Sequence, residues 1–480
     1  MPDTKLAVRK NIKSLKIIIA IIFLSTNVFI TSAQKVVTVR GIVSGVSWFD
    51  QNGDPVSAHG ANIIKDNGKY YLFGEKHYDD NPAFAGFNCY SSDDLYNWKF
   101  ESTALPVQKS GKLGPNRIGE RPKVLKCPKT GEYIMLMHAD TLTYKDQFTG
   151  YATAKKITGP YEFKGPILFN GKPIRKWDMG TFQDDDGSAY LIIHSGLLYK
   201  LSDDYKSIAE EVVDNKWHGS ESPTIFKKEG VYFWLASDLT SWERNDNFYY
   251  TAASLKGPWT YGGNVAPKGT LTWNSQCSFV LPVTGTQQTT YMYMGDRWSF
   301  PYQASAATYV WQPLHVNNTV LSIPEYQEAW QLDTKTGIAT ELKITGKTLN
   351  NEDKSIAYKG EWKTTDGEFA SARSNSKGDN FSVKFTGTQI GFYGIANPVG
   401  GYADVVVTDS KGKAVASAIV DAYSKYEVKS LLFLTPLLKK GNYILTVTVR
   451  GHHSKWSDKR KSNYGSTDDF ISLHSIIIKE

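Results

Sequence analysis

Residues 67–75 of the chain read NGKYYLFGE, a glycine-containing turn followed by a Tyr-rich apolar run that ends in a polar residue. The same order of features returns at TGEYIMLMH (130–138), DGSAYLIIH (186–194), EGVYFWL (229–235) and, more loosely, TTYMYMGD (289–296). Short apolar runs bounded by Gly, Asn and Asp predict β-strands. Strand-built units that recur every roughly 40–60 residues are typical of the blades of a β-propeller.

A second strand-like pattern trails the first in three of these units, as CYSS (89–92), YATA (151–154) and YTAA (250–253). Each unit therefore holds a hairpin and a further strand. Five copies predict an all-β fold with a five-bladed β-propeller over residues 34–330. A β-sandwich array with accidental internal similarity is the alternative.

The composition and the apolar pattern of the sequence change after residue 330. Residues 331–355 are rich in Lys, Thr and Gly and predict a connector. Residues 356–480 alternate apolar and polar positions, as in FSVKF (381–385) and YILTVTV (443–449), which predicts a β-sandwich of jelly-roll type. This domain is either a carbohydrate-binding module, with Trp362, Tyr393, Tyr402 and Tyr423 as candidate stacking aromatics, or a support for the propeller.

Residues 1–33 predict a secretory signal peptide, with a basic start, an apolar run over 17–30 and small residues before a cleavage site near Ala33. A secreted or periplasmic protein is therefore expected. This segment carries a net charge of +4, and subtracting it from the formal +7 leaves about +3. That charge argues against nucleic acid, or a membrane after signal cleavage, as a partner. The sequence predicts no cofactor.

Three cysteines, Cys89, Cys127 and Cys277, form no disulfide framework and no zinc-like spacing. No metal site is expected. His59, His138 and His194 could line the channel or bind a metal, but the favoured interpretation is that they are satisfied core histidines. DDDG (184–187) is interpreted as a solvated hairpin turn, since it lacks the ligand spacing of a calcium loop.

Inner propeller strands converge on one channel, so polar residues near the starts of the first strands are the candidate site residues. These lie in AHGAN (58–62), GERPKV (119–124), KWDMGTF (176–182), SESP (220–223) and NSQCSF (274–279). Glu120, Asp178 and Glu221 would then share one channel with Gln276. Like charges around a channel raise the pKa of at least one carboxyl group, and paired carboxyl groups are the usual equipment for glycoside hydrolysis.

These motifs together, with MGDRW (294–298), resemble glycoside hydrolase family 43, in particular its exo-β-1,3-galactanase branch. The resemblance implies an inverting exo-acting enzyme that releases galactose from β-1,3-galactan or arabinogalactan. It assigns Glu221 as general acid, Glu120 as the partner that modulates its pKa, and Gln276 as the residue facing the water. The implied substrate-binding residues are Glu75, Asp178, His59, Trp177 and Trp298.

One departure concerns the catalytic base. Most members of the resembled family carry an Asp where this chain reads SAHG (57–60), and the galactanase branch shares its absence. A neutral amide is a poor base, so Gln276 would act through its imidic tautomer or would only position water. Alternatives are an α-L-arabinofuranosidase or β-xylosidase on the same fold, or a non-catalytic glycan-binding propeller.

Overall fold

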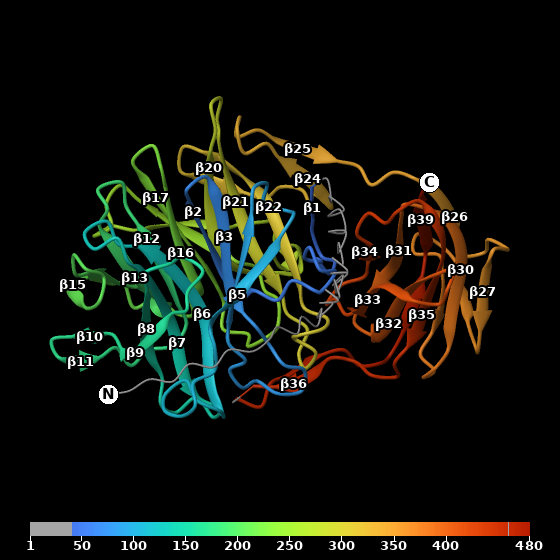
Figure 1. Cartoon of the computed structure of the whole chain (residues 1–480), viewed down its shortest axis with the longest axis horizontal. Coiled ribbons are helices and arrows are strands. Elements are labelled where there is room, and N and C mark those ends of the chain that lie inside the picture. The colour runs from blue at the N-terminus through green and yellow to red at the C-terminus, as the bar shows by residue number, and fades with distance from the viewer. Residues whose placement is uncertain (1–40, 459) are drawn as a thin grey trace, which may run out of the picture. The chain divides into compact units, whose positions relative to one another are not determined.

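The computed structural model describes residues 41–458 and 460–480 (Figure 1). The expected signal peptide, residues 1–33, lies outside these ranges. Within them, no helix has the length and apolar character needed to cross a membrane. The described chain is built almost entirely of β-strands, with one four-residue helix, α1 (Leu271–Asn274), and one short 3₁₀ turn, η1 (His194–Gly196).

Five four-stranded antiparallel sheets form the five blades predicted from the repeats. The first two blades are β2–β5 (His59–Asp66, Lys69–Glu75, Phe87–Ser92, Lys99–Leu105) and β6–β9 (Arg117–Lys126, Tyr133–Thr141, Phe148–Ala154, Glu162–Pro166). The third and fourth are β12–β15 (Met179–Gln183, Ala189–Ile193, Leu197–Leu201, Ile208–Asp214) and β16–β19 (Glu221–Lys228, Val231–Ser237, Phe248–Ala252, Thr260–Asn264). The fifth is β20–β23 (Gln276–Thr284, Thr289–Arg297, Thr308–Asn317, Val320–Ser322).

The first strands of the blades form a closed ring. Each of β2, β6, β12 and β16 contacts the first strand of the next blade, and β20 returns to contact β2. Polar side chains link neighbours in this ring: the Asn62 amide donates to the Val124 carbonyl at 2.9 Å, and the Ser278 hydroxyl donates to the Ala61 carbonyl at 3.0 Å. The starts of these strands, where the candidate residues lie, therefore meet at one place.

Apolar clusters fill the spaces between blades. Phe73 and Phe87 of the first blade share a fully buried cluster with Met135 and Leu113, and Leu72 shares another with Trp311 of the fifth. Burying a side chain of this size contributes about 1.5–3 kcal/mol. The continuous apolar runs of the repeats reflect this packing, because each blade is covered on both faces by its neighbours.

The strand pair β24 (Ala329–Leu332) and β25 (Ala339–Leu342) extends a sheet that begins with β1 (Ile42–Val43). The segment 331–355, predicted as a connector, contains the last two residues of β24, all of β25 and β26 (Lys347–Asn350). In the connection between the second and third blades, β10 (Leu168–Phe169) and β11 (Lys172–Pro173) form a two-stranded hairpin.

The remaining strands form the predicted β-sandwich, drawn in orange and red in Figure 1. One sheet has the order β26-β39-β31-β34, with β39 at Ser475–Lys479, β31 at Gln389–Ala396 and β34 at Val428–Leu434. The other has the order β27-β30-β35-β32-β33 (Ile356–Lys359, Asn380–Gly387, Gly441–Val449, Tyr402–Asp409, Ala414–Asp421). Phe381, Phe392, Val405 and Ile476 are among the residues of its buried core. Shorter strands are β28 (Lys363–Thr365), β29 (Ser371–Ser374), β36 (Lys455–Ser457), β37 (Asn463–Gly465) and β38 (Ile471–Leu473).

Candidate active site

Four of the five inner strands break register with their hairpin partners near the point where the candidate residues lie. The breaks fall between His59 and Asn62, Glu120 and Lys123, Glu221 and Thr224, and Cys277 and Phe279. A β-bulge of this kind adds one residue to a strand and redirects a side chain, and bulges are common beside active sites. The channel therefore receives its polar side chains through one repeated backbone feature.

Three of these bulges contain a residue in the left-handed region: Gly60 at φ 58°, Arg121 at φ 49° and Ser222 at φ 50°. Only at the first of them is the residue a glycine. A Cβ added to Gly60 would collide with the Glu75 carboxylate, so the close approach of that side chain requires glycine there.

Glu221 opens β16 and is partly exposed. Burial raises its pKa to about 8, the negative charges of Asp178 and Glu120 add to this shift, and Arg121 opposes it. A carboxyl group with such a pKa keeps its proton at neutral pH. Glu221 is thus equipped to donate a proton, which is the task of a general acid.

Glu120 is in the opposite protonation state. Its Oε2 lies 2.9 Å from Nδ1 of His138, and its Oε1 accepts a hydrogen bond of 2.7 Å from the Tyr144 hydroxyl. Burial opposes ionisation of Glu120, but the hydrogen bond and charge of His138 outweigh it and hold its pKa below the ordinary value. Although burial also disfavours a charged imidazole, the Asp140 carboxylate, 3.6 Å from Nε2, and the hydrogen-bonded Glu120 carboxylate raise the pKa of His138 to about 9.

Arg121 links its own blade, the second, to residues of three other blades. Its backbone N–H donates to Oε1 of Glu75 at 2.8 Å, its Nε contacts a carboxylate oxygen of Asp178, and its Nη2 donates to Oε1 of Gln276 at 2.8 Å. Asp178 in turn accepts a hydrogen bond from the backbone N–H of Ser222, directly after Glu221. Burial alone would lower the pKa of Arg121, but Asp178 and Glu75 raise it, so the guanidinium stays charged at the centre of the carboxylates.

Gln276 opens β20 and is 3% exposed. Its Oε1 accepts hydrogen bonds from Arg121 and, at 2.9 Å, from the Trp298 indole, while its Nε2 donates to the Ser237 hydroxyl at 2.9 Å. Guanidinium and indole nitrogens can only donate, so they fix which end of the amide is the oxygen. The oxygen thus faces two donors, and one N–H of the amide remains for a further partner.

The chain matches one protein family model and several solved structures. The model of glycosyl hydrolases family 43 matches residues 54–267, which cover the first four blades. A structure from Bifidobacterium bifidum, named as a candidate exo-β-1,3-galactanase, is 37% identical; the match covers 58% of this chain and 95% of that chain, with a TM-score of 0.55. The chain belongs to glycosyl hydrolase family 43.

Other family 43 structures match over more of the chain. The exo-β-1,3-galactanase from Phanerochaete chrysosporium, solved with galactose, is 27% identical, with 91% of this chain and 100% of that chain covered and a TM-score of 0.68. An exo-β-1,3-galactanase from Clostridium thermocellum is 25% identical, with 82% and 100% covered and a TM-score of 0.58. No match was found among curated proteins. The chain is therefore a glycoside hydrolase.

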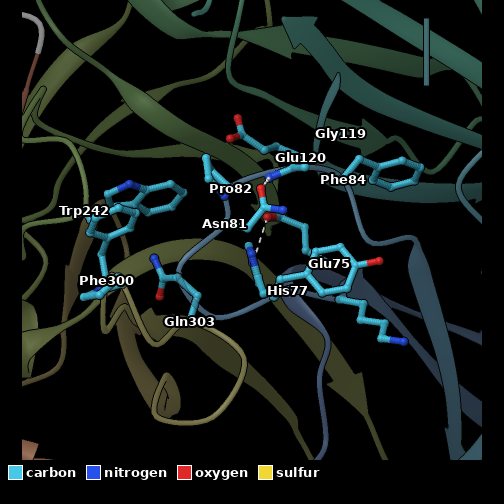
Figure 2. Close-up of a pocket in the computed structure, with 14 residues that line it drawn as sticks. Glu75, His77, Asn81, Pro82, Phe84, Gly119, Glu120, Trp242, Phe300 and Gln303 are labelled. Atoms are coloured by element: carbon cyan, nitrogen blue, oxygen red, sulfur yellow. Dashed lines mark hydrogen bonds and ion pairs between the residues drawn. The ribbon is translucent and has the colours of Figure 1, made fainter. Parts of the chain in front are cut away.

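A pocket beside Glu120, shown in Figure 2, has Glu75 and Glu120 in its wall, whereas Glu221, Asp178 and Gln276 do not line it. Glu75, His77 and Glu120 lie on one side of the pocket, and Trp242 and Phe300 lie on the other. The Glu75 carboxylate is 3.1 Å from Nε2 of His77. Of the expected substrate-binding residues, Glu75 therefore lines the pocket.

The other expected sugar contacts lie in different settings. His59 is 2% exposed, with Nδ1 3.0 Å from Asp296 and its ring stacked on Tyr309. Trp298 is also 2% exposed, held between Gln276 and the Trp242 ring. Trp177, in contrast, is 38% exposed and stacks on His194 at 4.0 Å, so one face of its ring is open to a ligand.

Among the described residues, no group of three or more His, Cys, Asp and Glu side chains is arranged to hold a metal ion. Asp184 and Asp185 pair with Lys227, each at 2.8 Å, in the turn between β12 and β13. His194 lies 2.8 Å from the Ser195 hydroxyl, and burial lowers its pKa to about 4, so it is neutral near pH 7.

Several residues of the site were not singled out from the sequence. Arg121 stands in the quoted GERPKV motif, directly after the candidate carboxylate Glu120, and that position was the available signal. Asp296 lies in the MGDRW motif, as the partner of His59. His138 was named from the sequence, but only as a core histidine, because its role as the partner of Glu120 has no local signal.

Proposed function

We propose that this family 43 enzyme is an inverting exo-β-1,3-galactosidase that releases galactose from β-1,3-galactan and related arabinogalactans. The observation that carries the proposal is the opposite protonation of Glu221 and Glu120 in one channel. The substrate class is supported by the galactanases it is similar to, one solved with galactose and, as variants, with β-1,3-galactotriose. Secretion follows from the leader expected at residues 1–33.

In the proposed reaction, Glu221 donates its proton to the oxygen of the leaving sugar as the glycosidic bond breaks. Glu120 remains ionised, and its charge helps to keep the proton on Glu221 until the transition state forms. Positive charge that develops on the galactose ring is stabilised by the surrounding carboxylates. A binding protein without catalysis has no need of a proton held at neutral pH beside an ionised carboxylate.

Gln276 is assigned to positioning the attacking water. Its oxygen already accepts from Arg121 and Trp298, so the amide form is favoured over an imidic form whose O–H would face two donors. The free N–H of the amide is then the group that holds the water oxygen. Nη1 of Arg121 is buried and has no hydrogen-bond partner among the described residues, which makes it a donor for a sugar hydroxyl or this water.

The deciding experiment incubates the enzyme with β-1,3-galactan, arabinan and xylan and follows the product anomer by NMR. The proposal expects galactose from galactan, appearing first as the α-anomer. Arabinose or xylose would replace the substrate assignment, and β-galactose would replace inversion with retention. Glu221→Gln is the matched control: it should lose turnover and keep galactose binding, whereas a glycan-binding propeller would show no turnover in either form.

A further inference from the structure

A buried polar cluster joins the sandwich to the propeller next to the active site. It consists of Glu243, Arg244 and Ser299 from the propeller, and Asp421 and Tyr423 from the end of β33 and the connection that follows it. The Tyr423 hydroxyl donates to Glu243 at 2.7 Å, and the Ser299 hydroxyl donates to Asp421 at 2.9 Å. Arg244 and Glu243 have side chains 2% and 0% exposed, so these groups are fully removed from water.

Arg244 is the centre of the cluster. Its guanidinium lies over the Tyr423 ring at 5.1 Å and 3.8 Å from the Asp421 carboxylate. Its Nη2 also donates to the backbone carbonyl of Trp298 at 2.8 Å. Burial raises the pKa of Asp421, and Arg244 opposes that shift. Removing one member of a buried charged network leaves the others without compensation, so the cluster holds its geometry firmly.

The same cluster reaches the catalytic residues through one short segment. The backbone carbonyl of Trp298 accepts the hydrogen bond from Arg244. The indole N–H of Trp298 donates to Oε1 of Gln276 at 2.9 Å. The Tyr402 hydroxyl of β32 lies 3.1 Å from the Ser299 carbonyl and 3.2 Å from that of Phe300. Phe300 lines the pocket beside Trp242, whose ring packs on Trp298 at 5.1 Å (Figure 2).

We propose that Tyr402, Asp421 and Tyr423 of the sandwich are positioning residues for the glycosidase site. They hold Arg244 and the segment 298–300, and through Trp298 they set the orientation of the Gln276 amide and of the pocket wall. Tyr402 and Tyr423, 0% and 6% exposed, are thereby occupied in the contact with the propeller and offer no open stacking face. This inference rests on the proposed function, because it gives Gln276 a place in the reaction.

The test compares Tyr423→Phe with Tyr393→Phe. Both remove one hydroxyl of the sandwich that donates at 2.7 Å to a propeller glutamate, Glu243 in one case and Glu328 in the other. Only the first belongs to the cluster around Arg244. Small displacements in a catalytic site cost up to about 100-fold in rate. We expect Tyr423→Phe to lower kcat about 10-fold or more, and Tyr393→Phe to change only the melting temperature.

A second readout does not depend on the substrate. The indole N–H resonance of Trp298, assigned by its loss in Trp298→Phe, should shift in Tyr423→Phe and stay in place in Tyr393→Phe. Asp421→Asn, which keeps the shape and removes the charge, should shift it as well.

The outcomes separate the two proposals. If the wild type cleaves no galactan, the proposed function fails, and the positioning role of the sandwich residues is judged on the Trp298 resonance alone. If the wild type is active but Tyr423→Phe matches Tyr393→Phe in kcat and in that resonance, the positioning role is wrong while the function stands.

Discussion

Nη2 of Arg121 lies 2.8 Å from Oε1 of Gln276, although the two residues are 155 positions apart in the chain. The guanidinium also contacts Asp178, so one side chain sets both a carboxylate and an amide. This contact bears directly on the absence of a carboxylate base. Because the oxygen of Gln276 is held by two donors, the proposed function has the amide act on water through its N–H.

Gln276→Glu tests that role. The carboxylate keeps the contacts with Arg121 and Trp298 but has no N–H, so we expect kcat to fall by about 100-fold, the usual effect of losing one preorganised donor. Steady-state kinetics on β-1,3-galactobiose measure it. Ser237→Ala, which removes the acceptor of Nε2 together with the contacts of that hydroxyl to Ser222 and to the Glu221 carbonyl, should cost less. Activity equal to or above that of the wild type in Gln276→Glu would mean that the site lacked a base, not a donor.

Glu221 should control the alkaline limb of the pH–rate profile. As an acid it works only when protonated, and its pKa of about 8 places the loss of kcat above neutral pH. An alkaline limb that begins near pH 5 would contradict the raised pKa of Glu221.

The same shift predicts a change in stability with pH. Because the folded protein holds a proton on Glu221 that the unfolded chain releases above its ordinary pKa of 4.5, this group destabilises the fold increasingly as pH rises from about 4.5 to 8. The melting temperature of Glu221→Gln should therefore rise relative to the wild type across that range. A constant difference would contradict the raised pKa.

His138 makes a pH-dependent contribution of the opposite kind. Its folded pKa of about 9 exceeds the ordinary 6.5, so its stabilisation is complete below pH 6.5 and is lost as pH rises through 9. The melting temperature of His138→Gln should lie furthest below that of the wild type near pH 6, and the gap should close toward pH 9. His194→Gln is the control: His194 has a pKa lowered to about 4, so its gap should be flat above pH 6.5.

Trp177 is expected to act in substrate binding. Its open ring face, supported by His194, suits stacking against a sugar, so Trp177→Ala should raise KM for galactan several-fold and leave kcat nearly unchanged. Tyr261→Ala, at a 57% exposed aromatic on the outer strand β19, controls for the loss of a surface ring. A fall in kcat without a change in KM would place Trp177 in the chemistry instead.

The blades and the starts of their inner strands were predictable because their signals are local. Glycine turns, apolar runs and the polar residues before them lie within about ten positions of one another. Glu120, Asp178, Glu221 and Gln276 were therefore found by one positional rule. The register breaks beside them were not, because left-handed backbone at Arg121 and Ser222 follows from contacts made with other blades.

Partnerships between strands were equally hidden. His138 looks like the end of an apolar strand, and only the pairing of β6 with β7 places it opposite Glu120. Trp298 was expected to face the sugar, yet its indole is covered because the segment that follows it packs against Tyr402 of the sandwich. Such contacts depend on how whole sheets are oriented, which no single window of sequence records.

The repeated bulge makes the backbone geometry of the channel independent of the side chains that the channel presents. It is defined by backbone pairing, so it presents whichever side chain occupies its first position: His59 in β2, Glu120 in β6 and Glu221 in β16, with Gln276 one position before the bulge of β20. A substitution there exchanges an acid, an amide or an imidazole without refolding a blade. Evolution can therefore revise the chemistry of such a propeller one strand at a time, with the replacement of a carboxylate base as one such step.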